Sequence, residues 1–386
     1  MITKALVVDA PGGDFVYRDV KVDDDIRATE VLVEIVATGM CHTDITFSQH
    51  DIEGLFPAIF GHEGAGIISK VGSKVTNVQV GDYVILSYTS CGECKNCLNN
   101  QTSFCGDWEI DNFGIGRGGD GSKAYEFPPE DEAVGTEITS HFFGQSCFSN
   151  FAVVEARCCI KVGEPGDVDV DLSSLAPLGC GIMTGAGAML NVLKPTADDI
   201  VCVVGAGAVG LAAIMAVNLL EKKPRQIIAV DFVKERLELA KTYGATHVVN
   251  PTTERDLPGA LKRITNFEGV DVSIDATGIP KVVEDLLEAT AKLGTVCSVG
   301  VEELDATVST NIFNAVNSGR KYVGCCMGNA YPPEFVPKLI QGWNEGRFPF
   351  TDLITRYSAE DVEKAKADVL SGKAVKAVLV WGAPTN

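Results

Sequence analysis

The sequence predicts an α/β protein that combines a doubly wound parallel sheet with a second, β-rich domain. Short apolar runs separated by Gly, Pro and Asp fill the first part of the chain. After about residue 182, apolar strands alternate with helices, which is typical of a parallel sheet covered on both faces. Within that part, a run of 21 uncharged residues, Ile200 to Leu220, is interrupted by three closely spaced glycines.

Length and composition limit the class of protein. The 386 residues suggest two or three domains at roughly 150 residues each. Hydrophobic residues make up 46%, which is too much for a disordered chain. Lys and Arg number 32 against 52 Asp and Glu, a formal charge of −20. This acidity argues against nucleic acid or an anionic membrane as a partner.

The first part of the chain is expected to contain strands. The pattern predicts them at Ala5–Val8, Val31–Val36, Gly66–Val71 and Asp82–Leu86. The N-terminal residues show no apolar segment before a small-residue cleavage site, so no signal peptide is expected. Together with cysteines in metal-binding patterns, this predicts a cytoplasmic protein.

The second part is expected to alternate strand and helix. The uncharged run exceeds the threshold of roughly 18 residues for a membrane span, but a buried strand followed by a buried helix gives the same hydropathy. We interpret Ile200–Val204 as a strand and Val209–Leu220 as a helix. Later strands are predicted at Gln226–Val230, Thr246–Val249, Val270–Asp275, Thr295–Val299 and Val375–Trp381, and helices at Lys234–Tyr243 and Ala359–Leu370.

A glycine-rich loop indicates a nucleotide site. Gly205, Gly207 and Gly210 form a GxGxxG pattern between a predicted strand and a predicted helix. The first glycine permits a tight turn, the second lets the backbone approach a pyrophosphate, and the third allows close helix packing. Inside a βαβ unit, this pattern predicts a Rossmann domain.

Acidic Asp231 ends the next predicted strand. A carboxylate there binds the ribose 2′-hydroxyl and repels the 2′-phosphate of NADP, so NAD is the predicted cofactor. The alternative is a glycine-rich helix start with a surface aspartate. Arg236 is a further candidate for the adenosine ribose, with an exposed helix arginine as the alternative.

Four cysteines with short spacings predict a structural zinc site. They are separated by two, two and seven residues, and they are Cys91, Cys94, Cys97 and Cys105. Four thiolates close a tetrahedral site and leave no open position for a substrate. The spacing fits neither ferredoxin pattern, and disulfides are disfavoured in a reducing compartment.

A second, scattered set predicts a catalytic metal. Cys41, His62 and Cys180 together make a Cys₂His set with an open fourth position, although each residue alone has an ordinary packing interpretation. A zinc ion held in this way acts as a Lewis acid on a bound alcohol.

These motifs resemble the zinc-dependent medium-chain dehydrogenase/reductase family over nearly the whole chain. The resemblance rests on GMCHTD (39–44), GHEGAG (61–66), the four-cysteine loop and the loop at 205–210. The segments LGCGIMTGAG (178–187), FFGQS (142–146) and GRFPF (346–350) are most similar to aryl-alcohol (benzyl-alcohol) dehydrogenases. The resemblance implies a GroES-like zinc-binding domain at 1–181 and 326–386 and a Rossmann domain at 182–325.

The resemblance also implies roles for single residues. Asp44 would orient His62, Glu63 would lie behind the metal, and Thr43 would begin the proton path from the substrate. The cofactor would be held by His42, Thr184, Val209, Val299 and Lys376, although a solvated lysine is the alternative at 376. Thr46 stands where many members have the histidine that ends the proton relay, so water is expected to complete it.

The sequence thus predicts an NAD-dependent zinc alcohol dehydrogenase with two zinc ions per chain, acting on a primary alcohol or aldehyde. Aromatic or allylic substrates are favoured, and aromatic candidates for the substrate site, with core packing as the alternative, are Tyr88, Phe142, Phe143 and Phe148. Two enzymatic alternatives remain, a glutathione-dependent formaldehyde dehydrogenase and a reductase of a specialised metabolite. An NAD-binding protein without turnover is disfavoured by the intact Cys₂His set. A homo-oligomer, dimer or tetramer, is expected, with Ala306–Phe313 as a candidate edge strand shared between subunits.

Overall fold

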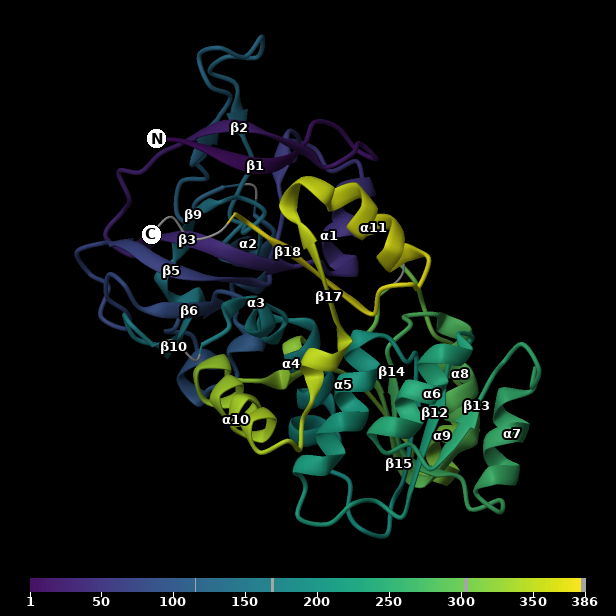
Figure 1. Cartoon of the computed structure of the whole chain (residues 1–386). Coiled ribbons are helices and arrows are strands. Elements are labelled where there is room, and N and C mark those ends of the chain that lie inside the picture. The colour runs from purple at the N-terminus through teal and green to yellow at the C-terminus, as the bar shows by residue number, and fades with distance from the viewer. Residues whose placement is uncertain (115, 168–169, 302–304, 383–386) are drawn as a thin grey trace. The chain divides into compact units, whose positions relative to one another are not determined.

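The computed structural model describes residues 1–114, 116–167, 170–301 and 305–382. They divide into two compact units (Figure 1). The first comprises Met1–Cys180, Tyr331–Pro337 and Thr351–Asn386, and the second comprises Gly181–Ala330 and Lys338–Phe350. The predicted domains differ from these units mainly at 326–330 and 338–350. In the structure, 338–350 packs within the second unit because Gly342 lies against Leu219 and Arg347 donates to the Asn218 carbonyl.

Two sheets form the first unit. A five-stranded sheet has the order β4-β1-β2-β7-β8, and a seven-stranded sheet has the order β10-β6-β5-β3-β18-β17 with β9 paired to β3. The strands of the five-stranded sheet are β1 (Ile2–Val8), β2 (Val16–Val22), β4 (Ala58–Ile59), β7 (Tyr125–Glu126) and β8 (Glu137–Ile138). Those of the seven-stranded sheet are β3 (Glu30–Gly39), β5 (Gly64–Val71), β6 (Tyr83–Leu86), β9 (Phe151–Glu155), β10 (Cys159–Gly163), β17 (Ile354–Ser358) and β18 (Lys376–Val380).

Short helices occupy the connections of the first unit. They are α1 (His42–Gln49), α2 (Trp108–Phe113), α3 (Leu172–Leu175) and α11 (Val362–Leu370). The Asp171 carboxylate caps α3 by accepting from the backbone N–H groups of Ser173 and Ser174. Leu172 and Ala176 pack on Ala37, Ala65 and Val378 of the seven-stranded sheet. This packing fixes the segment that ends at Cys180.

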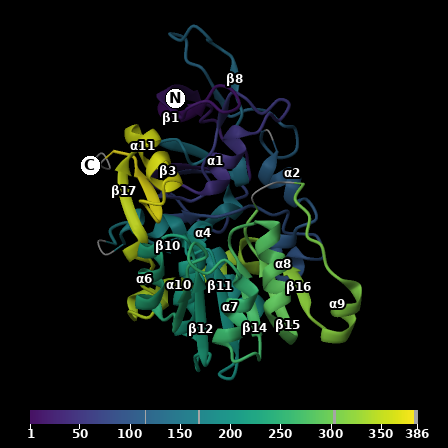
Figure 2. The same cartoon turned by 90° about the vertical axis from the view of Figure 1, so that its right-hand side faces the viewer.

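The second unit contains a six-stranded parallel sheet with helices around it. Its order is β13-β12-β11-β14-β15-β16. From β11 the chain adds strands toward one edge of the sheet as far as β13, and then returns to add β14, β15 and β16 toward the other edge. The strands are β11 (Ile200–Val204), β12 (Gln226–Val230), β13 (His247–Val249), β14 (Val270–Asp275), β15 (Thr290–Ser298) and β16 (Lys321–Gly324). Figure 2 shows β12, β11, β14, β15 and β16 side by side. Ligands of doubly wound sheets bind at such a reversal, at the carboxyl ends of the strands.

Helices of the second unit are α4 (Gly181–Gly187), α5 (Ala208–Ala216), α6 (Lys234–Tyr243), α7 (Leu257–Ile264), α8 (Pro280–Ala289) and α9 (Ile312–Ser318). One further helix, α10 (Pro332–Asn344), begins in the first unit and ends in the second. Strand β11 is completely buried, and α5 is buried from Gly210 to Ala216, so the uncharged run is a strand and a helix as predicted. Within the described ranges no single helix is long and apolar enough to cross a membrane. One bent pair of helices, Leu172–Gly179 with Gly181–Leu193, reaches the length and apolar composition of a membrane span, by those two criteria alone.

The single chain does not form the expected edge strand at Ala306–Phe313: residues 306–311 lie in no helix or strand, and Ile312 begins α9. Asn311 caps helix α9 with its side chain, which accepts from the Asn314 N–H, and the helix ends at Gly319 in the left-handed conformation. Local capping therefore places the last two residues of this segment in a helix. The edge of the sheet on this side is β16.

Candidate active site

The three scattered ligand candidates meet in the first unit. The ligand atoms of Cys41, His62, Cys180 and Glu63 all lie within 4.8 Å of one another. Cys41 immediately precedes α1, His62 and Glu63 immediately precede β5, and Cys180 follows the turn Ala176–Gly179. Residues separated by more than one hundred positions thus form one cluster of metal-ligand chemistry.

Glycines allow the close approaches in this cluster. A Cβ atom at Gly39 would lie 2.0 Å from Glu63 Oε2, and one at Gly179 would lie 2.0 Å from the Leu86 carbonyl oxygen. Gly61 has φ +91°, a conformation that L-residues rarely adopt, and a Cβ there would meet Phe148. The glycines of the GMCHTD, GHEGAG and LGCG segments therefore allow the ligand residues to approach one another.

Asp44 orients the histidine. Its Oδ1 accepts from His62 Nδ1 at 2.8 Å and from the Gly61 N–H at 3.0 Å, and its Oδ2 accepts from the Cys41 N–H at 3.0 Å. Both Asp44 and His62 are completely buried. One carboxylate thus ties both ligand segments together and fixes the imidazole ring.

The other ring nitrogen fits a metal ion. His62 Nε2 is buried and has no hydrogen-bond partner among the described residues. A buried polar atom without a partner is costly, and a metal ion bound here removes that cost. The chemistry of the donor set, two thiols and an imidazole beside a carboxylate, is that of a zinc site with one open or exchangeable position.

Charges around the cluster favour a thiolate. Hydrogen bonding from the Cys180 thiol, aided by His62 and Lys376, holds the pKa of Cys41 well below its usual value despite burial. The same contact raises the pKa of Cys180 well above its usual value. Burial lowers the pKa of His62, but Asp44 and Cys41 raise it to about 10 overall. Metal binding must therefore displace protons from this site.

Lys376 lies behind the cluster. Its ammonium donates to Glu63 Oε1 at 2.7 Å and to the Met40 carbonyl at 3.1 Å, and the residue is 3% exposed. The alternative of a solvated lysine is therefore wrong, because β18 lies within the seven-stranded sheet and buries this side chain. Its predicted contact with the cofactor stays a prediction.

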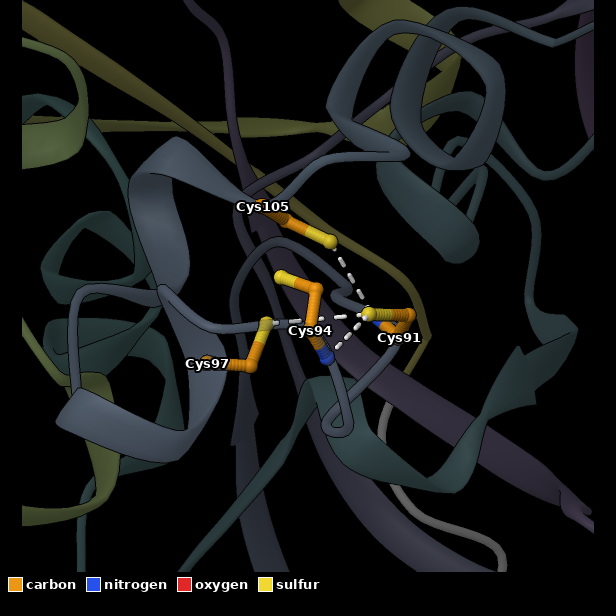
Figure 3. Close-up of side chains that lie close together, drawn as sticks. All are labelled: Cys91, Cys94, Cys97 and Cys105. Carbon is orange, nitrogen blue, oxygen red and sulfur yellow. Dashed lines mark hydrogen bonds between the residues drawn. The ribbon is translucent and has the colours of Figure 1, made fainter.

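The four-cysteine loop brings its thiols together, as Figure 3 shows. Their sulfur atoms lie within 4.8 Å of one another. Backbone N–H groups point at them: Cys94 N donates to Cys91 Sγ at 3.3 Å, Cys91 N to Cys105 Sγ at 3.3 Å, and Gly106 N to Cys94 Sγ at 3.4 Å. Hydrogen bonds from Cys97 and Gly106 lower the pKa of Cys94 to about 6. This is the structural zinc site that the spacing predicted.

The glycine loop of the second unit leaves room for a phosphate. Gly205 has φ +90°, and a Cβ at Gly210 would lie 1.8 Å from the Gly205 carbonyl oxygen, so both positions require glycine. A Cβ at Gly207 would meet no atom within 4 Å, because the backbone there faces open space at the start of α5. Asp231 closes the loop by accepting from the Ala206 N–H at 2.7 Å and the Val233 N–H at 2.7 Å.

Other cofactor candidates lie at separate places. In the second unit, Thr184 is buried in α4, Val209 is in the first turn of α5, and Val299 follows β15. The Thr184 hydroxyl and Arg236 Nε are buried atoms without a hydrogen-bond partner in the described ranges, so both can receive a ligand group. In the first unit, His42 is exposed on the first turn of α1 and Thr43 Oγ1 lies 3.6 Å from Cys41 Sγ.

Aromatic rings surround His62 in the first unit. Phe143 stacks on the imidazole with centroids 4.4 Å apart, and Phe142 meets it edge-on at 5.6 Å. Phe113 contacts both phenylalanines, and Phe47 stacks on Phe113 at 5.0 Å. Of the other predicted aromatic candidates, Phe148 packs on Phe15 in the core and Tyr88 packs on Trp108.

Two supporting residues were not predicted from the sequence. Gln145 is completely buried; it donates to the carbonyls of His62 (3.0 Å) and Ser87 (2.7 Å) and accepts from the Gly64 N–H. Ser87 in turn donates to the Gly179 carbonyl at 2.7 Å. A glutamine inside the aromatic segment FFGQS was the available signal, because such a side chain in a core must find hydrogen-bond partners.

Comparison with known proteins agrees with this chemistry. Residues 27–164 match the family described as "Alcohol dehydrogenase GroES-like domain", and residues 208–342 match "Zinc-binding dehydrogenase". The chain therefore belongs to the zinc-dependent alcohol dehydrogenase family, whose members are NAD-dependent oxidoreductases.

Three relatives illustrate the range of that family. Geraniol dehydrogenase of Castellaniella defragrans is 33% identical over 98% of this chain and 97% of its own length. S-(hydroxymethyl)glutathione dehydrogenase of Komagataella pastoris is 34% identical over 97% of each chain. The crystal structure of benzyl alcohol dehydrogenase from Acinetobacter calcoaceticus superposes with a TM-score of 0.90 and 36% identity, covering 99% of this chain and 100% of that one. The predicted family and fold class are thus confirmed.

Proposed function

We propose that this enzyme interconverts primary aromatic or allylic alcohols and their aldehydes, with NAD as the hydride acceptor. The observation that supports this substrate class is the group of rings around His62, above all Phe142 and Phe143. A substrate oxygen bound at the metal beside His62 brings its carbon chain within reach of these rings. Flat, unsaturated chains gain most from such contacts.

In the proposed mechanism, Cys41, His62 and Cys180 would hold the catalytic zinc. Zinc held there would supply Lewis-acid polarisation of an alcohol oxygen, and NAD would supply the hydride-accepting chemistry. Asp44 keeps the Nδ1 proton of His62 engaged, so that Nε2 presents its lone pair to the metal. The Thr43 hydroxyl would accept the alcohol proton while passing its own proton to a water molecule, which would complete the path to solvent in place of a histidine at position 46. Lys376 neutralises Glu63, which lies within ligand distance of the same cluster.

The cofactor-binding residues are proposed from the loop geometry and the atoms left without partners. Gly205, Gly207 and Gly210 would receive the pyrophosphate, and Asp231 would bind the adenosine ribose. Arg236 would add a donor to the same ribose, and His42 and Lys376 would contact the pyrophosphate. Thr184, Val209 and Val299 would support the nicotinamide.

Steady-state kinetics test the substrate class. We expect kcat/KM for benzyl alcohol and for an allylic alcohol to exceed that for ethanol by about tenfold or more, since one or two methylene-sized contacts are worth that much in an apolar site. A preparation that holds about two zinc ions per chain and yet oxidises none of these alcohols with NAD would refute the proposal. Equal values for ethanol and benzyl alcohol would refute the substrate class alone.

A glutathione-dependent formaldehyde dehydrogenase is the second candidate, because relatives with that kind of name match nearly the full chain at 33–34% identity. Formaldehyde oxidation that requires added glutathione, with little turnover of benzyl alcohol, would favour it. Turnover of an enone or iminium with NADH, without alcohol oxidation, would instead favour a reductase of a specialised metabolite.

We further propose that the enzyme is cytoplasmic and forms a homo-oligomer. None of the thirteen cysteines, all of which are described, forms a disulfide, which suits a reducing compartment. Exposed apolar residues gather on α9, where Ile312, Phe313 and Val316 are each at least 75% exposed. A surface of this kind is typical of an interface with another chain.

A further inference from the structure

Helix α2 connects the four-cysteine site to the rings around His62. It begins at Trp108, three residues after Cys105, and the Trp108 N–H donates to the Cys105 carbonyl at 3.2 Å. Cys105 Sγ accepts from the N–H groups of Asp107 (3.4 Å) and Cys91 (3.3 Å). The position of the thiols therefore determines where this helix starts.

Two side chains of α2 reach the rings. Trp108 meets Phe143 edge-on at 6.2 Å, and Phe113 meets Phe143 edge-on at 5.2 Å. Phe143 in turn stacks on His62 at 4.4 Å with an interplanar angle of 20°. A continuous series of ring contacts thus extends from the four-cysteine loop to a candidate ligand of the catalytic metal.

Polar contacts hold α2 firmly. Asn112 is completely buried and accepts from the Thr89 N–H at 3.0 Å while donating to the Thr89 carbonyl at 3.1 Å. Tyr88 packs on Trp108 at 5.0 Å, and its hydroxyl lies 2.6 Å from Thr102 Oγ1 inside the four-cysteine loop. These contacts leave Trp108 and Phe113 little freedom to move independently of the loop.

The segment that carries Phe143 needs support from its neighbours. Phe143 has φ +55°, and His141 and Ser146 have φ +69° and +48°. Three non-glycine residues in the left-handed region are unfavourable by themselves and persist only where surrounding contacts hold them. Trp108 and Phe113 supply such contacts directly on Phe143.

We infer that Trp108 and Phe113 are positioning residues that fix Phe143 beside His62 and so determine which alcohols the enzyme accepts, and that the four-cysteine metal site sets their position. The inference concerning alcohols rests on the proposed function. The four-cysteine site, whose closed ligand set leaves no position for a substrate, thereby contributes to substrate specificity. Trp108 and Phe113 act through Phe143 and are not assigned contact with the reacting atoms.

The test compares W108L, W108F and F113L with I110A. Ile110 is 74% exposed on the same helix and contributes no ring, so I110A is the matched control. For W108L and F113L we expect the KM of benzyl alcohol to rise about tenfold or more relative to that of ethanol, as altered apolar contacts produce. Zinc content and the kcat of ethanol stay near the wild-type values, W108F recovers most of the loss, and I110A changes neither KM.

Equal shifts of both KM values in W108L and F113L, or no shift in either, would overturn the inference. If W108L does not fold, F113L decides by the same criterion. A Cys94→Ser chain tests the role of the thiol cluster: it should lose one zinc ion and change the near-UV circular dichroism in the same sense as W108L. An unchanged aromatic spectrum in that variant would refute the role of the four-cysteine site.

A second readout does not depend on turnover. With Co²⁺ in place of zinc at the site of His62, the visible absorption reports the geometry of the ligands. We expect this absorption to shift in W108L and to stay unchanged in I110A. If the wild type oxidised no alcohol, the proposed function would fail while this shift still supported the positioning role; an unchanged absorption in W108L would contradict it.

Discussion

At the scale of single residues, Asp44 connects the two segments that carry Cys41 and His62. Its two oxygens accept three hydrogen bonds, from His62 Nδ1 and from the N–H groups of Gly61 and Cys41. An asparagine side chain has one acceptor oxygen and an NH₂ group, so Asp44→Asn leaves at least one of these donors unpaired. We expect the affinity for the catalytic zinc to fall about 10- to 100-fold, as loss of a histidine's orienting partner does in metal sites.

Competition with a chromophoric chelator measures this change. The affinity of the four-cysteine site should remain as in the wild type, which provides an internal control in the same molecule. Zinc affinities unaltered at both sites would show that Asp44 does not orient a ligand.

At the same scale, we predict that Asp231 determines the preference for NAD over NADP. Two like charges about 4 Å apart repel by about 1 kcal/mol in water and about 4 kcal/mol near a protein surface. Removing the carboxylate in Asp231→Ser should therefore raise the ratio of kcat/KM for NADP to that for NAD by about tenfold or more. The variant should also lose stability, because the N–H groups of Ala206 and Val233 lose their acceptor.

Kinetics with both cofactors check this prediction, and Asp256→Ser serves as the control. Asp256 caps α7 in the same unit and accepts from the Gly259 N–H, so its replacement removes another carboxylate bonded to a backbone N–H without altering Asp231. A ratio that changes equally in both variants would contradict the role of Asp231.

At the scale of elements, strand β9 contains a titrating carboxyl group. Burial, together with the charges of Glu30 and Asp111, raises the pKa of Glu155 to about 7. A pKa raised in the folded state means that the protonated group stabilises the fold below its unfolded pKa, and that this stability is lost as the pH rises through 7. Glutamine resembles the protonated acid in shape and charge.

Glu155→Gln should therefore be more stable than the wild type at pH 8, by about 1–3 kcal/mol, and nearly equal to it at pH 5. The free energy of unfolding in urea at both pH values measures the difference. Glu109→Gln, at an exposed position of α2, is the control. Its free energy of unfolding should differ from that of the wild type by the same small amount at both pH values. A stability difference between Glu155→Gln and the wild type that is the same at pH 5 and pH 8 would contradict the assignment.

Elements with strong local signals were predicted well. Strand β11 and the start of α5 follow from an apolar run and a glycine pattern, and the structure has Ile200–Val204 as predicted and Ala208–Ala216 close to the expected helix. The helix that begins at Ile312 was not predicted, because it depends on a single capping contact at Asn311. Helix α2 gave no sequence signal, since six residues do not show a periodicity.

Site residues were predictable where residue type defines chemistry. Cys41, His62 and Cys180 followed from metal-ligand chemistry and from the family resemblance, and the structure brings them within 4.8 Å together with Glu63. The burial of Lys376, the hydrogen bonds of Gln145 and the contacts of Trp108 depend on tertiary packing between distant segments. Composition and spacing contain no information about such packing.

At the scale of the whole molecule, we predict self-association through the surface of α9. Ile312, Phe313 and Val316 are 79%, 75% and 77% exposed, and no residue of this helix is buried. In the described ranges β16, the neighbouring strand, pairs only with β15, so one of its edges is open. An open edge beside an apolar patch suits a two-fold interface, in which the same surface is used by both copies.

The double variant F313E/V316D should therefore dissociate the oligomer, because burying two carboxylates costs several kcal/mol of association free energy per subunit. Light scattering coupled to size-exclusion chromatography measures the mass, with Phe232→Glu as the control, since Phe232 is an exposed aromatic residue (62%) on the same unit but away from α9. We expect the wild type and the control to be at least dimeric and the double variant to run as a monomer that retains its zinc. A wild type that is monomeric at all concentrations, or a double variant with unchanged mass, would show that this surface does not bind a second copy.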